Sequence, residues 1–221
     1  YRIGINQFGY AGSESFRIVD TPATATITPR ALTITANDVT KAYGQGLNLG
    51  VSEVSVAQDN GTSPSGLVAG DAVTAMNVQS DGAAANANAA GTPYTITASG
   101  ATGNGLGNYN ITYVDGALTV NRAPLTIIGQ DQVKAEGDTF TFNGTEFSVS
   151  GLVVAGDRVD SALISSDGSP ASATAAGSPY VIAVNGATGT RLDNYDITYV
   201  DGAMTVTNPA VTQSPPPPTF T

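Results

Sequence analysis

The side chains of this sequence that could do chemistry are mostly aspartates that stand beside glycines. Their carboxylates could bind calcium, which prefers oxygen ligands. The sequence contains no D-x-D/N-x-D/N-G loop, however, and aspartate next to glycine is also a common composition of tight turns. We therefore expect turns at these positions, with no metal and no cofactor. These pairs include Gly70-Asp71, Asp81-Gly82, Asp115-Gly116, Gly156-Asp157, Asp167-Gly168 and Asp201-Gly202.

Side chains suited to catalysis are scarce. Histidine and cysteine are absent from the sequence, which removes the commonest general base, the thiolate nucleophile and the usual zinc ligands. No serine stands in a G-x-S-x-G elbow. A glycosidase would need two opposed carboxylates, and the sequence contains only four glutamates. The sequence therefore predicts no enzyme and no catalytic residues. The glutamates are Glu14, Glu53, Glu136 and Glu146.

The composition argues against two classes of partner. The net charge is −10, and the only lysines are Lys41 and Lys134. Nucleic acids and anionic membrane surfaces both attract basic patches, so we expect neither as a partner. No apolar run in this segment approaches the roughly 20 residues of a membrane span. We expect a monomer whose closest contacts are neighbouring parts of the same chain.

The sequence is dominated by an internal repeat. "NYNITYVDGALTV" at 108–120 returns as "NYDITYVDGAMTV" at 194–206, and "ALTITANDVTKAYG" at 31–44 aligns with "PLTIIGQDQVKAEG" at 124–137. Such similarity at a fixed spacing indicates tandem structural units. The offset is longer in the front half, so we expect extra loop residues in 55–66 of the first unit.

These alignments predict the domain boundaries. We expect a first repeat at 31–123 and a second at 124–208. Residues 1–30 align with the back half of a repeat, since Tyr1 and Phe16 fall at repeat positions, so they are interpreted as the C-terminal remnant of a preceding one. The segment 209–221 is proline-rich and is predicted to be an extended linker.

Each repeat is predicted to be all-β. Strand-forming residues alternate with glycine, asparagine and aspartate turns, and no stretch has a sustained helical period. A small Ig-like β-sandwich is the expected fold, with repeats stacked into a rod; a β-grasp arrangement with one short helix is the alternative. In 108–120 the alternation predicts a β-hairpin around Asp115-Gly116, in which Tyr113 faces Leu118.

Taken together, these segments resemble a known family. "LTITANDVTKAYG", "AAGTPYTITASG" and "NYNITYVDGALTV" are similar to the MBG repeats, also called YDG-type repeats, of very large bacterial exoproteins. The resemblance covers about residues 31–207. The second repeat departs from it at Glu136, where the family usually has a tyrosine, as the first repeat does at Tyr43. The resemblance implies filamentous-haemagglutinin-like adhesins exported by two-partner secretion, whose repeats form stalks at the outer membrane in attachment or biofilm formation. "TAAG" at 174–177 also resembles a protease cleavage motif of some biofilm adhesins.

A secreted, cell-surface spacer and adhesion module is thus the leading expectation. Two alternatives remain at this point. A carbohydrate-binding module for matrix polysaccharide or host glycan would use exposed aromatic side chains, and Phe8, Tyr10 and Tyr43 are the candidates outside the repeat-equivalent core positions. A linker rigidified by calcium would use the aspartates. Glycosylation sequons begin at Asn60, Asn110 and Asn143.

Overall fold

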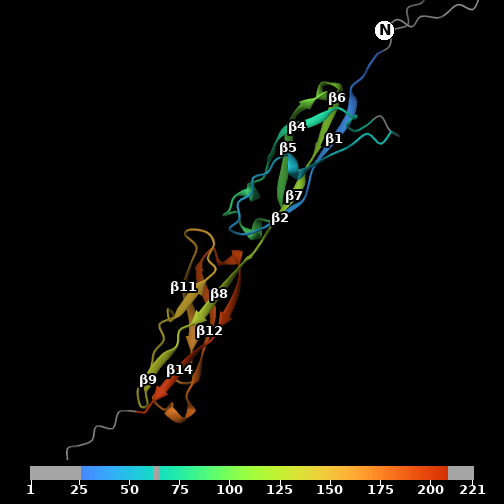
Figure 1. Ribbon diagram of the computed structural model, residues 1–221. Coiled ribbons are helices and arrows are strands. Elements are labelled where there is room, and N and C mark those ends of the chain that lie inside the picture. Colours follow the sequence, from blue (N-terminus) through green and yellow to red (C-terminus); the bar gives the residue numbers. More distant parts are fainter. Residues whose placement is uncertain (1–25, 62–64, 209–221) are drawn as a thin grey trace, which may run out of the picture.

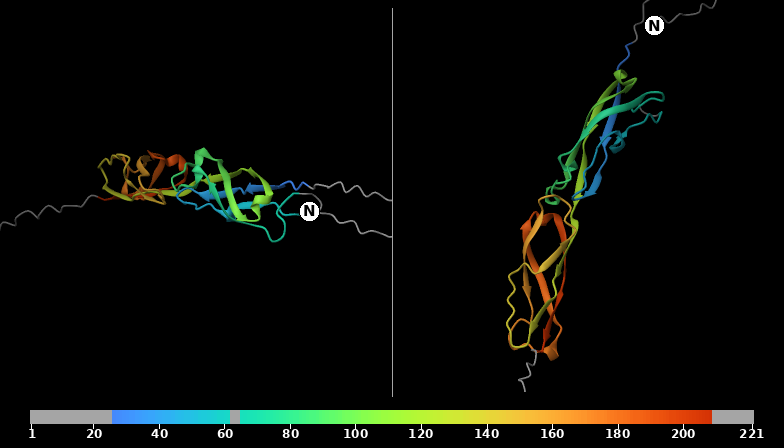
Figure 2. Two further views of the ribbon diagram at one scale, coloured as in Figure 1. Left: turned by 90° about the horizontal axis from the view of Figure 1, so that it is seen from above. Right: turned by 60° about the vertical axis from the view of Figure 1, so that its left-hand side comes forward.

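The computed structural model describes residues 26–61 and 65–208. Two β-rich bodies lie end to end along one axis (Figure 1), and the views from other sides show the same elongated arrangement (Figure 2). The N-terminal remnant predicted for 1–30 falls almost entirely outside the described residues, as do Phe8 and Tyr10. The proline-rich segment 209–221 lies outside them as well.

The described residues of the first repeat form seven strands in two sheets. One sheet has the order β3-β1-β6 and the other the order β2-β7-β5-β4. Leu32 and Ile34 of β1 pack with Val73 and Met76 of β4, so the core lies between the sheets. The strands are β1 (Arg30–Ala36), β2 (Val39–Ala42), β3 (Val54–Val56), β4 (Ala72–Gln79), β5 (Tyr94–Asn104), β6 (Tyr109–Val114) and β7 (Gly116–Asn121), with short 3-10 helices η1 (Val51–Glu53), η2 (Asp81–Ala83), η3 (Ala89–Gly91) and η4 (Leu106–Asn108).

The second repeat has the same topology. Its sheets have the orders β10-β8-β13 and β11-β12-β14-β9. The all-β prediction is confirmed, and every helix in the described part of the chain is a 3-10 turn of three residues. The elements are β8 (Ala123–Gly129), β9 (Gln132–Ala135), β10 (Phe147–Ser150), β11 (Arg158–Ser165), β12 (Tyr180–Thr190), β13 (Tyr195–Val200) and β14 (Gly202–Thr207), with η5 (Ala175–Gly177) and η6 (Leu192–Asn194).

The hairpin predicted around Asp115-Gly116 is wrong. β6 pairs in parallel with β1, whereas β7 pairs in parallel with β2 and antiparallel with β5. Both parallel ladders have the same offset, because Arg30 faces Tyr109 and Val39 faces Leu118, each 79 positions on (109 − 30 = 118 − 39). Residues 30–42 and 109–121 are therefore two long, adjacent strands that cross together from one sheet to the other.

The crossing explains why the sequence resembled a hairpin. Before it the inward residues are odd-numbered, such as Tyr109 and Tyr113, and after it they are even-numbered, such as Leu118 and Val120. A tight turn would shift the phase of the alternation in the same way. The Asp-Gly pair thus marks a change of sheet. Two carboxylates support it from the neighbouring strand, since Asp38 accepts from the Ala117 amide and Asp131 from the Ala203 amide, both at 2.8 Å.

Gly116 is needed for the close approach of the two crossing strands. A Cβ at this position would lie 2.5 Å from the Ala36 carbonyl oxygen, and a Cβ at the equivalent Gly202 would lie 2.6 Å from that of Gly129. Gly116→Val should therefore lower the free energy of unfolding of the first repeat by about 1–3 kcal/mol. Chemical denaturation measures it, with the exposed Gly107→Val as control, because a Cβ there meets nothing within 4 Å. Equal effects of the two substitutions would contradict the crossing.

Candidate functional site: the junction between the repeats

A single residue connects the two repeats. β7 ends at Asn121 and β8 begins at Ala123, so only Arg122 lies between strands. Ala123 and Pro124 are already part of β8. The Arg122 Nε donates to the Asp193 carbonyl at 2.9 Å. Its guanidinium lies 3.8 Å from the Asp196 carboxylate in an exposed ion pair, which stabilises the junction little.

The hydrophobic core continues across this connection. Tyr43 and Ala89 of the first repeat belong to one cluster of buried side chains with Leu125 and Tyr195 of the second. Gly44 brings the backbone of the first repeat against Val153, because a Cβ on Gly44 would lie 2.5 Å from the Val153 Cγ2. The two repeats therefore share buried apolar surface, which resists both bending and separation.

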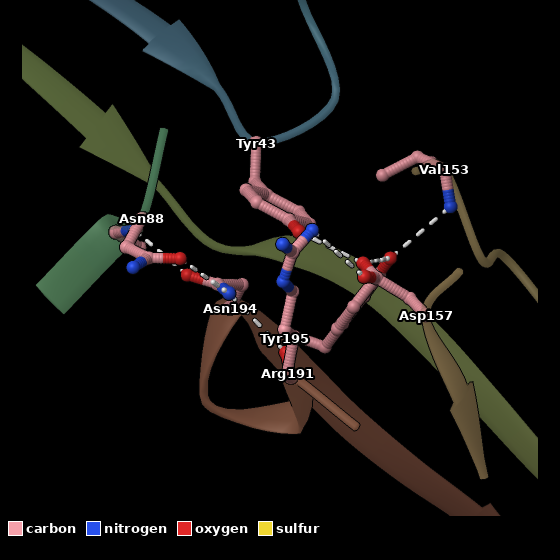
Figure 3. Close-up of polar contacts among 8 residues, drawn as sticks. Tyr43, Asn88, Val153, Asp157, Arg191, Asn194 and Tyr195 are labelled. Carbon is pink, nitrogen blue, oxygen red and sulfur yellow. Dashed lines mark hydrogen bonds and ion pairs between the residues drawn. The ribbon is translucent and has the colours of Figure 1, made fainter. Parts of the chain in front are cut away.

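A buried carboxylate is the centre of the polar contacts at the junction (Figure 3). Tyr43 of the first repeat donates its hydroxyl to Asp157 Oδ2 at 2.8 Å, and Tyr195 of the second donates to the same oxygen at 2.7 Å. The two rings meet edge to face, with centroids 5.4 Å apart. The Arg191 guanidinium lies 3.7 Å from Asp157 Oδ1, and the Asp157 side chain is fully buried. Asp157 is thus stabilised by charge and by donors from both repeats.

Asn194 makes the second polar contact across the junction. Its Oδ1 accepts from the Ala89 amide at 2.8 Å, and its Nδ2 donates to Asn88 Oδ1 at 3.2 Å. The Ala89 amide begins η3 and has no partner inside that turn, so Asn194 supplies the acceptor that a helix start needs. Asn194 is itself buried, which makes the loss of either bond costly.

Lys41 holds the turn that presents Tyr43. Its ammonium donates to the carbonyls of Gln45 and Ala84, and the lysine is buried. Burial lowers the pKa of Lys41. The second lysine, Lys134, is buried in the equivalent turn of the second repeat. Both lysines of the chain are therefore structural, and neither offers an exposed charge to a ligand.

The junction also raises the pKa values of its two tyrosines. Burial raises the pKa of Tyr43 to about 12, and the hydrogen bond to the Asp157 carboxylate adds to the shift. The pKa of Tyr195 is raised for the same two reasons. A tyrosinate beside a buried carboxylate would be a like-charge pair, so the junction requires both hydroxyls to keep their protons.

The raised pKa gives a prediction for alkaline pH. The folded state holds the Tyr43 proton more tightly than the unfolded state, where the pKa is 10.0. This stabilisation is complete below pH 10 and is lost as the pH rises towards 12, by about 2–3 kcal/mol in all. Unfolding free energies measured across this window should fall more steeply for the native chain than for Tyr43→Phe, which has no phenolic proton. Identical pH profiles would contradict the predicted role of Tyr43.

Comparison with known proteins identifies the family of the chain. The sequence model of the MBG domain (YGX type) matches residues 32–119 and 125–205, which together are most of the chain. The chain belongs to the MBG domain family. No curated protein matches it. The junction residues Tyr43, Ala89, Asp157 and Asn194 all fall inside the matched segments, so the contact is made by the MBG repeats themselves.

Several of the candidate residues for glycan and calcium binding have partners within the protein. Tyr43 is only 2% exposed, so its choice as a glycan-binding aromatic is wrong: the ring packs on Tyr195 and the hydroxyl is bonded to Asp157. Asp71 accepts from Tyr109 at 2.6 Å, and Asp201 accepts from the Val184 amide at 3.1 Å. Among residues 26–61 and 65–208, no three acidic side chains converge as a metal site would require.

The "TAAG" segment lies in a folded turn. Ala175–Gly177 forms η5, and the amide and carbonyl of Thr174 both bond to the Tyr180 hydroxyl at 3.1 Å. Of the sequon asparagines, Asn110 is exposed on β6, and Asn143 Oδ1 accepts from the Thr145 amide. Within the described residues, no helix is long and apolar enough to cross a membrane.

Sequence reasoning missed Asp157 and Asn194 as junction residues. Both have counterparts in the first repeat, Asp71 and Asn108, and so looked like ordinary repeat positions. The usable signal was the contrast between the repeats at Tyr43, which aligns with Glu136. A position that differs between otherwise similar repeats is where a contact between repeats, rather than within one, is to be sought.

Proposed function

We propose that this segment is a non-catalytic stalk of a secreted bacterial adhesin, and that it holds adhesive regions away from the cell surface in attachment or biofilm formation. The observation that carries the proposal is the junction: one connecting residue, a continuous core and a buried carboxylate with donors from both repeats. A stalk needs neighbouring repeats fixed in one relative orientation, and these contacts supply that.

The surface location rests on the resemblance to repeats of large bacterial exoproteins and on membership of the MBG family. The chemistry of the chain suits that setting. With a net charge of −10, long arrays of such repeats repel one another and stay soluble. The absence of histidine and cysteine from the sequence supports a mechanical role over an enzymatic one. We expect the chain to be monomeric.

The stalk should not depend on calcium. Asp157 at the junction and Asp38, Asp131 and Asp201 at the crossings already have protein donors. We therefore expect the melting temperature to be the same with calcium and with chelator. A metal at a hundredfold excess over its dissociation constant would add about 2.7 kcal/mol. Thermal melts across a calcium titration measure this, and a saturable rise in melting temperature would favour a calcium-rigidified linker instead.

Small-angle scattering tests the mechanical proposal. The native chain should scatter as an elongated monomer, and a long Gly/Ser segment inserted between Arg122 and Ala123 should broaden the distribution of sizes while the melting of each repeat is kept. If the native chain already scatters as two freely jointed bodies, or as one compact globule, the stalk has no physical basis. Adding matrix polysaccharide to the same sample should leave its scattering unchanged, whereas complex formation would favour the carbohydrate-binding alternative.

A further inference from the structure

The C-terminal ends of the two repeats differ from each other. The difference lies at the position that Tyr43 occupies in the first repeat. In the first repeat Tyr43-Gly44 contacts the second repeat through Asp157 and Val153. In the second repeat the aligned pair is Glu136-Gly137. The supporting turn is otherwise the same, because Lys134 donates to the carbonyls of Asp138 and Pro170, the counterparts of the two Lys41 acceptors, at 2.7 and 2.8 Å.

Glu136 accepts the hydrogen bond that a residue of a following repeat would otherwise accept. In the first repeat the Ala89 amide donates to Asn194 of the following repeat. Its counterpart in the second repeat, the Ala175 amide, donates at 2.9 Å to Glu136 Oε2 of its own repeat. The C-terminal end of the second repeat therefore satisfies internally the donor that the first repeat satisfies across the junction.

The charge of Glu136 also opposes docking. A third repeat of this kind would bring a buried aspartate, equivalent to Asp157, to the position where Tyr43 donates its hydroxyl. A glutamate carboxylate cannot replace the tyrosine hydroxyl as a donor to that aspartate, and two carboxylates at one buried site repel each other.

We propose that Glu136 ends the series of docked repeats: the C-terminal face of the second repeat is closed to another MBG repeat, and a tyrosine at position 136 would open it. Docking is thus directional and is decided by one residue on the upstream repeat. This inference concerns the order of repeats and stands on the junction geometry, whether or not the protein is an adhesin.

The test extends the full chain by a third repeat. Residues 1–207 are followed directly by a second copy of residues 122–208, which reproduces the single-residue connection at Arg122. Because the protein has no cysteine, a spin label can be placed at chosen sites by substitution to cysteine. Val181→Cys in the second and third repeats reports on the new junction. The exposed Thr95→Cys paired with Val181→Cys reports on the native one in the same chain.

Pulsed dipolar spectroscopy then compares the native junction with three forms of the new junction. The native junction should be narrow, the new junction with Glu136 broad, and the new junction with Glu136→Tyr narrow. Glu136→Gln, which removes the charge but supplies no aromatic hydroxyl, should remain broad. A narrow distribution with Glu136, or a broad one with Glu136→Tyr in a chain whose repeats all melt normally, would overturn the proposal. A broad native junction would instead overturn the stalk, so the two failures are distinguishable.

Discussion

Replacing Asp157 with alanine is expected to uncouple the two repeats while leaving each folded. The substitution removes the acceptor of two buried hydroxyls, on Tyr43 and Tyr195, and the partner of Arg191. Each buried donor left without an acceptor costs about 1–3 kcal/mol. The free energy of unfolding of the second repeat and its junction together should therefore fall by about 3–5 kcal/mol. The free energy of unfolding and the width of the distance distribution across the junction are the two measurements.

Asp71→Ala is the matched control for this change. Asp71 is the counterpart of Asp157 in the first repeat and accepts from Tyr109 at 2.6 Å, without a donor from the second repeat. Asp71→Ala should therefore lower the stability of the first repeat and leave the junction distances narrow. If both substitutions broaden the distances equally, or if Asp157→Ala broadens nothing, the carboxylate is not what couples the repeats.

Gly44→Ala should have the next largest effect on the junction. Gly44 has a φ of 89°, so alanine there is strained. In addition its Cβ would lie 2.5 Å from Val153 Cγ2 and 2.7 Å from Val153 Cβ, which forces the repeats apart. We expect about 1–2 kcal/mol from the backbone conformation and about 1–3 kcal/mol more from the collision.

The second repeat again offers the control. Gly137 has a similar φ of 93°, but a Cβ there meets nothing within 4 Å. Gly137→Ala should therefore show the backbone cost alone and leave the junction distances unchanged. The difference between the two substitutions in chemical denaturation isolates the contact with Val153, and equal losses of stability would show that no such contact exists in solution.

Much of the fold could be predicted from the sequence because the same pattern occurs in two repeats that can be aligned. Two aligned copies of an alternating pattern indicate strands, and the aligned tyrosines Tyr109 and Tyr195 are buried as expected of core anchors. The place of the extra residues also follows: β3 and β10 pair equivalently with β1 and β8, so the added length lies after Val56. The pairing partners of β6 and β7 were beyond reach, because a phase shift at Asp115-Gly116 is common to a hairpin and to a change of sheet.

The junction was harder to predict for a physical reason. A contact between repeats joins residues distant in sequence, such as Tyr43 and Asp157, and each of them has an ordinary explanation within its own repeat. Tyr43 could be an exposed aromatic, and Asp157 looks like the aspartate of a turn. Only the structure shows that burial and a shared hydrogen bond bring them together.

The most direct test of a rigid junction is one distance in the full native chain. Thr95 and Val181 are equivalent, exposed positions on β5 and β12, one in each repeat. Spin labels on Thr95→Cys and Val181→Cys should give a single narrow distance distribution, which becomes broad when a Gly/Ser segment follows Arg122. A distribution that is already broad in the native chain, and unchanged by the insertion, would contradict the account.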